Sequence, residues 1–192
     1  LKYAEKNPIS NFLLDNFTLQ LKEIVKNIEC KEVLDVGCGE GVMLAKLKDV
    51  LVNKICTGVD IDINHIEKAN LNAPFCSYQE GSIYDLKFPC NTFDLVMCLE
   101  VLEHLEYPKK AVRELKRISV KYVLISVPRE PIWRILNMAR GSYWRDLGNT
   151  PGHLNNWSTK QIKKLLKKDF EILEIRKPLP WTIILCEVRD FQ

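Results

Sequence analysis

The stretch that most constrains the fold is residues 33–41, which read VLDVGCGEG. The apolar half predicts a buried strand, and the three alternating glycines predict a tight turn of bare backbone before a helix. In a sheet protein such a turn lies at the carboxyl end of its strand, where exposed amide groups can receive a small ligand. We therefore expect a nucleotide-type cofactor at this turn.

Length and composition favour one globular domain over residues 1–192. The chain is 46% hydrophobic and 28% charged, and it has no apolar run long enough to cross a bilayer. The net charge of +3 is too small to favour nucleic acid as a partner. Seven scattered cysteines without a Cys-x-x-Cys pair indicate reduced thiols, and the charged opening is unlike a secretory signal. We expect a cytoplasmic protein, either a monomer or a homodimer.

Apolar strands alternate with helices along the chain, which predicts a parallel sheet covered on both faces. The last two strands are joined by only four residues, 177–180, so we expect them to be antiparallel. The predicted fold is α/β, a single doubly wound sheet of seven strands. A helical cap is expected over 1–30 and a lid-like insertion over 129–157. Expected strands are 33–36, 55–60, 75–81, 93–99, 122–127, 170–176 and 181–188; expected helices are 9–28, 42–51, 64–69, 108–119 and 158–168.

Asp60 closes the second predicted strand. A right-handed crossover places this strand beside the first, so the carboxylate lies level with the glycine turn. There it can accept the hydroxyl protons of a ribose. The alternative is a helix N-cap, a role that Asp62 fits better.

The G-x-G-x-G spacing resembles that of the class I S-adenosylmethionine-dependent methyltransferases, as do Asp35, Asp60, Asp94 and the closing antiparallel hairpin. Within that class the chain resembles the type 11, ubiquinone-biosynthesis-like small-molecule methyltransferases. The resemblance implies a Rossmann-like sheet, S-adenosyl-L-methionine as cofactor and S-adenosyl-L-homocysteine as product. The residues it implies at the methionine half and ribose are Asp35, Gly37, Gly39, Gly41 and Asp60, and Ile61 and Leu99 are further expected cofactor-binding residues.

The adenine side departs from this family, which usually has an acid after the third strand. Here Ser82 and Ile83 take that place, and they can offer a hydroxyl oxygen and a backbone amide. Asp85 is a substitute acid, less well placed. The alternative is that Ser82 and Asp85 are ordinary turn residues.

Residues 100–104, EVLEH, resemble the segment of ubiquinone-biosynthesis methyltransferases that faces the transferred methyl group. His104 is the candidate general base, with Glu100 and His153 as further candidate catalytic residues. Glu100, Glu103, His104 and His153 also resemble the metal-binding set of small-RNA 2′-O-methyltransferases and some quinone O-methyltransferases. We do not favour the interpretation as a divalent-metal site, because the same segment can simply begin a helix.

The 129–157 insertion is rich in aromatic and basic residues, and long insertions at this edge of a sheet commonly carry function. Arg129, Trp133, Tyr143 and Trp144 are candidate substrate-binding residues for an anionic or aromatic acceptor. The alternative is a segment that packs on the domain or forms a dimer contact.

The sequence thus predicts methyl transfer to a small-molecule or glycolipid-like acceptor, at oxygen. The alternatives are an RNA methyltransferase and a non-catalytic protein that binds S-adenosylmethionine.

Overall fold

The computed structural model describes residues 8–139, 141 and 143–189. Residues 1–7, the beginning of the expected 1–30 cap, lie outside this set. The strands are β1 (Glu32–Val36), β2 (Ile55–Asp60), β3 (Ser77–Glu80), β4 (Phe93–Leu99), β5 (Ser119–Pro128), β6 (Phe170–Arg176) and β7 (Trp181–Val188). The helices are α1 (Pro8–Lys26), α2 (Val42–Lys46), α3 (Lys48–Leu51), α4 (Ile63–Asn72), α5 (Pro108–Ile118), α6 (Ile132–Ala139) and α7 (Thr159–Leu166), with short 3₁₀ turns η1 (Leu102–His104) and η2 (Trp144–Asp146).

These strands form one seven-stranded sheet in the order β3-β2-β1-β4-β5-β7-β6. The pairs from β3 to β5 are parallel, whereas β7 is antiparallel to both β5 and β6. The predicted fold class is therefore confirmed, including the antiparallel hairpin. The strand order reverses between β1 and β4, and ligands of open α/β sheets bind outside the carboxyl ends of the strands at such a point.

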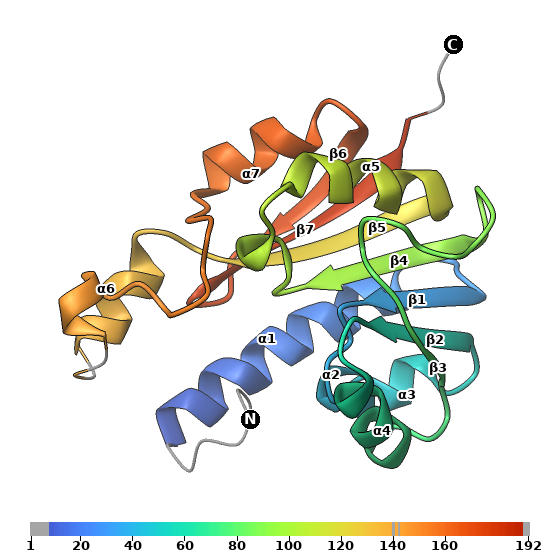
Figure 1. Cartoon of the computed structure of the whole chain (residues 1–192), viewed down its shortest axis with the longest axis horizontal. Helices are drawn as coiled ribbons and strands as arrows, with labels where there is room; N and C mark the ends of the chain where they lie inside the picture. Colours follow the sequence, from blue (N-terminus) through green and yellow to red (C-terminus); the bar gives the residue numbers. More distant parts are fainter. Residues whose placement is uncertain (1–7, 140, 142, 190–192) are drawn as a thin grey trace.

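Alternation along the strands divides the core into two layers (Figure 1). In β4, Leu95 and Met97 pack with the residues of α1, α2 and α3, whereas Val96 and Cys98 pack with those of α5 and α7. Because side chains alternate between the faces of a strand, a strand apolar throughout its length is covered on both sides.

The structure differs from the expected elements in the bounds of several of them and in one helix that it divides. The helix expected over 42–51 is two short helices, α2 and α3, which meet at Leu47. The insertion contains α6, and it ends at the capping box of α7, where the side chain of Ser158 accepts from the Gln161 amide. Among the described residues, no helix has the length and apolarity needed to span a membrane.

Candidate functional site

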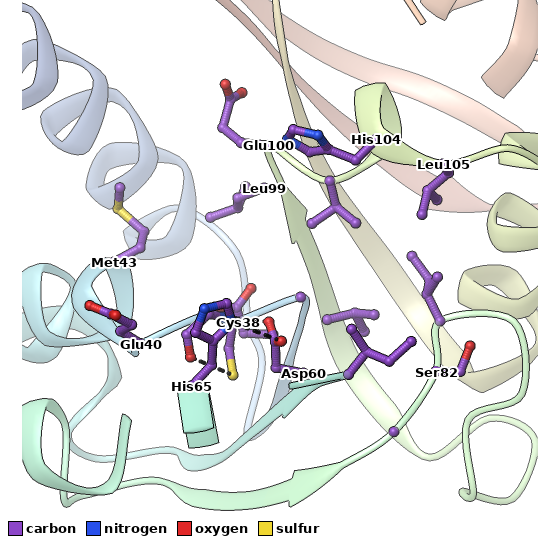
Figure 2. Close-up of a pocket in the computed structure, with 18 of the residues that line it drawn as sticks. Cys38, Glu40, Met43, Asp60, His65, Ser82, Leu99, Glu100, His104 and Leu105 are labelled. Atoms are coloured by element: carbon purple, nitrogen blue, oxygen red, sulfur yellow. Dashed lines mark hydrogen bonds and ion pairs between the residues drawn. The ribbon is translucent and has the colours of Figure 1, made fainter. Parts of the chain in front are cut away.

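A cavity of about 650 Å³ lies at the carboxyl ends of β1, β2 and β4. Four segments line it: the glycine loop after β1, the end of β2 with the start of α4, the turn after β3, and the segment from the end of β4 to η1 (Figure 2). The lining includes eight of the nine expected cofactor residues: Asp35, Gly37, Gly39, Asp60, Ile61, Ser82, Ile83 and Leu99.

The glycine loop is held to β2 by its backbone. The amides of Gly37 and Cys38 both donate to the Val59 carbonyl, at 2.7 and 3.0 Å. Gly37 and Gly39 have φ values of +77° and +53°, a region that side chains rarely adopt. A Cβ at Gly37 would lie 2.5 Å from Val101 Cγ2, whereas one at Gly39 would meet nothing within 4 Å. The space beside the Gly39 backbone is therefore open, and a ligand can approach it.

Gly41, the ninth expected cofactor residue, is not among the residues that line the cavity. Its φ is +73°, and a Cβ there would lie 3.0 Å from both Cα and Cβ of Ala69. Gly41 thus permits the close approach of α4 to the start of α2.

Asp60 is buried at the end of β2, with 8% of its surface exposed. Its Oδ2 accepts from the Gly39 amide at 2.8 Å, and its Oδ1 accepts from the Asp62 amide at 3.0 Å. The Nδ1 atom of His65, in the first turn of α4, lies 3.1 Å from the same Oδ1. Asp62 is the N-cap of α4 and accepts from the Asn64 amide, so the capping alternative belongs to Asp62 as expected.

Asp35 lies beside Asp60 and is 2% exposed. Burial, and then the neighbouring charge of Asp60, raise the pKa of the Asp35 carboxyl from 3.8 to about 7. Two neighbouring acids at one end of the cavity favour a positively charged ligand group there, because its charge offsets their repulsion.

Ser82 and Ile83, the residues expected on the adenine side, also line the cavity. The Ser82 hydroxyl accepts from the Tyr84 amide at 3.3 Å. Asp85 is not among the lining residues, and its carboxylate pairs with Lys87. The structure therefore does not bring Asp85 to the cavity as a substitute acid.

Glu100 turns away from the glycine loop (Figure 2). Its φ is +60°, and its carboxylate accepts from Ser126 Oγ and Trp181 Nε1, both at 2.8 Å. The side chain, 8% exposed, ties the end of β4 to β5 and β7. Glu100 lines part of the cavity, but its oxygens are engaged on the side of these partners.

Glu103, His104 and His153 form a cluster in which one ligand atom from each residue lies within 4.8 Å of the others. Glu103 and His153 are buried, and His104 lines the cavity. The rings of His104 and His153 pack edge to face, with their centroids 4.9 Å apart. His104 Nδ1 lies 2.9 Å from the Gly152 carbonyl oxygen. Glu100 is not part of this cluster, so the structure brings together three of the four residues of the metal-binding alternative.

None of the four expected substrate-binding residues, Arg129, Trp133, Tyr143 and Trp144, is among the residues that line the cavity. The Trp133 indole donates to Thr150 Oγ1 at 2.9 Å, and its ring stacks on His153 at 6.0 Å. Trp144 is 64% exposed. The insertion contacts a residue of the cavity wall through the Gly152 carbonyl, which lies 2.9 Å from His104 Nδ1.

The sequence interpretation missed His65 as a residue of the cavity. Its position in the sequence, five residues after Asp60 and in the first turn of the next helix, could have predicted this. A side chain there points back toward its own N-terminus and hence toward the strand end.

Comparisons with known proteins agree with this geometry. Residues 34–121 match a family model described as a methyltransferase domain. An uncharacterized methyltransferase of Schizosaccharomyces pombe is 35% identical over 115 residues, 53% of this chain and 40% of that protein. A ubiquinone biosynthesis O-methyltransferase of Glaesserella parasuis is 28% identical over 172 residues, 76% of this chain and 67% of that protein. The chain thus spans between two fifths and two thirds of these relatives.

A solved structure shares the fold. The magnesium protoporphyrin IX methyltransferase of Synechocystis PCC 6803, crystallised with bound SAH, has a TM-score of 0.72 and 17% identity, with 97% of this chain and 90% of that chain covered. Over residues 34–121 the chain is thus similar to a methyltransferase domain, and its sheet order and strand-end cavity agree with the fold of the class I S-adenosylmethionine-dependent methyltransferases.

Proposed function

We propose that this chain transfers the methyl group of S-adenosylmethionine to an oxygen atom of a small-molecule acceptor. The observation that carries the proposal is that one cavity joins the glycine loop and Asp60 at one end to His104 at the other. A donor held at the first end would present its reactive group to the second.

In this proposal the chain's own groups hold the donor by four kinds of contact. Asp60 takes ribose hydroxyl protons, and the bare backbone at Gly37 and Gly39 allows close approach. Asp35, beside Asp60, faces the ammonium or sulfonium charge, which stabilises its ionised form. Ser82 and Ile83, with Leu99 and Ile61, enclose the adenine.

His104 is the proposed general base. The Gly152 carbonyl can only accept a hydrogen bond, so the neutral imidazole carries its proton on Nδ1 and leaves Nε2 as the basic nitrogen. In the proposed step the acceptor oxygen forms a bond to the methyl carbon as the carbon–sulfur bond breaks. The electron pair stays on sulfur, and the acceptor's proton goes to Nε2.

Binding of a divalent cation by Glu103, His104 and His153 is the alternative to the general-base role, because an ion bound to His104 Nε2 would occupy the nitrogen that accepts the proton. One carboxylate and two imidazoles are a donor set that transition metals accept, and the three ligand atoms are close enough to share one ion. A cation there would lower the pKa of an acceptor hydroxyl. Glu100, engaged by Ser126 and Trp181, would instead hold the segment that carries these ligands.

Oxygen as the accepting atom is supported by the similarity to a ubiquinone biosynthesis O-methyltransferase. We expect the acceptor to enter beside the insertion that contacts His104. Around the acceptor, an outer layer would be formed by Arg129, Trp133, Tyr143 and Trp144.

The test is transfer of a labelled methyl group from S-adenosylmethionine to a panel of phenols, catechols and lipid-linked phenols, compared with bulk RNA. The proposal predicts a labelled O-methyl product that is lost in His104→Ala while binding of S-adenosylhomocysteine is kept. Product on RNA alone would favour the RNA methyltransferase alternative, and a protein that binds the cofactor but labels no acceptor would favour the non-catalytic one.

A further inference from the structure

His65 shares the Asp60 carboxylate that we assign to the ribose. Its Nδ1 is 3.1 Å from Asp60 Oδ1, and its side chain, 41% exposed, lines the cavity (Figure 2). The ring is thus both a partner of the acid and a wall of the site.

The hydrogen-bond capacity of Asp60 limits what the acid can bind alone. A carboxylate has about four acceptor positions, roughly two on each oxygen. Oδ1 already receives the Asp62 amide and the His65 ring, and Oδ2 receives the Gly39 amide. One position remains, on Oδ2, whereas a ribose brings two neighbouring hydroxyl groups.

The imidazole can supply the missing position. Because Asp60 accepts, the neutral ring places its proton on Nδ1, and this leaves Nε2 as an acceptor. The nearest acid to that nitrogen is Asp62, whose Oδ2 is 4.0 Å away, beyond hydrogen-bond distance. Lys68, further along α4, is paired with Glu40 of the glycine loop.

We propose that His65 and Asp60 act as a pair that reads the ribose diol, with one hydroxyl on Asp60 Oδ2 and the other on His65 Nε2. This proposal rests on the proposed function, since it requires an adenosyl ligand in the cavity. It assigns a ligand-binding role to a residue outside the glycine loop and the strand ends.

The experiment is calorimetric titration of the whole chain with S-adenosylhomocysteine and with its 2′-deoxy and 3′-deoxy forms. Loss of one neutral hydrogen bond weakens binding by about tenfold at most sites. We expect the wild type to bind each deoxy form at least about tenfold more weakly than the parent, since one hydroxyl pairs with a neutral imidazole and the other with a charged carboxylate. His65→Asn keeps a donor near the Nδ1 position but lacks Nε2.

His65→Asn is expected to bind the parent about tenfold more weakly, and to bind one of the two deoxy forms as well as it binds the parent. His65→Gln, whose amide reaches the Nε2 position, should restore part of the lost discrimination. Glu67→Gln, an exposed change on the same helix, should leave all three affinities unchanged.

Two results would overturn the pairing: parent affinity unchanged in His65→Asn, or both deoxy penalties equal to those of the wild type. Circular dichroism of the ligand-free variants identifies any that do not fold, and His65→Gln then carries the test. If the wild type itself binds none of the three ligands, the proposed function fails and not the pairing alone.

Discussion

Replacing Asp35 by Asn will change how the stability of the ligand-free protein depends on pH. Burial and the charge of Asp60 raise the pKa of this carboxyl from 3.8 to about 7 in the folded state. The folded protein therefore binds this proton more tightly than the unfolded chain does. The stabilising contribution is fully present below pH 3.8, and it is lost as pH rises through about 7.

The size of this effect follows from the shift. A rise of about 3 pKa units corresponds to about 4 kcal/mol, at about 1.4 kcal/mol for each unit. Between about pH 4 and about pH 8 the free energy of unfolding of the wild type should fall by about 4 kcal/mol through Asp35 alone. Asp35→Asn cannot lose a proton, so its curve lacks this fall.

Urea unfolding followed by circular dichroism, at a series of pH values, measures both curves. Asp94→Asn is the matched control, because the amides of Glu32 and Lys31 hold the pKa of Asp94 below its usual value. Asp94 therefore stabilises the protein above its unfolded pKa, and this contribution is lost as pH falls through the lower, folded value. Parallel curves for wild type and Asp35→Asn would refute the reasoning.

Three further changes test other parts of the account. Gly41→Ala should lower the free energy of unfolding by about 1–3 kcal/mol, since its φ and the contact with Ala69 both resist a side chain; a thermal melt unchanged from wild type would contradict this. Trp181→Phe removes a donor from the buried Glu100 carboxylate and should destabilise the protein by about 1–3 kcal/mol in urea, whereas a neutral effect would mean that Glu100 is held otherwise. His104→Ala should keep the affinity for S-adenosylhomocysteine within about twofold, since only the proton acceptor is removed; a large loss of affinity would place His104 in cofactor binding.

Much of the fold could be predicted from local pattern. The strands 93–99, 170–176 and 181–188 were expected with the bounds observed, because each carries a strand pattern of apolar residues and is bounded by turn residues. The place of β7 between β5 and β6 could not be predicted from local pattern. It depends on which strands pair along its two edges, and that pairing is not encoded within the strand itself.

The candidate site, like the fold, could be predicted only in part. Asp35, Asp60 and Ser82 could be placed because parallel strands end at one edge of the sheet. The direction of Glu100 could not, since it follows from a positive φ and from partners 26 and 81 residues away.

Residue type alone also left two roles open. Gly41 carries the same signal for ligand approach as for helix packing. The aromatic residues of the insertion give no sign in sequence of whether they pack on His153 or face a substrate.

The most direct test of the central claim is calorimetric titration of S-adenosylhomocysteine into the wild type and into Asp60→Ala. The account predicts one binding site in the wild type and an affinity at least about tenfold weaker in the variant, because Asp60 holds the ribose. Equal affinity in the two proteins, or no binding by the wild type, would contradict it.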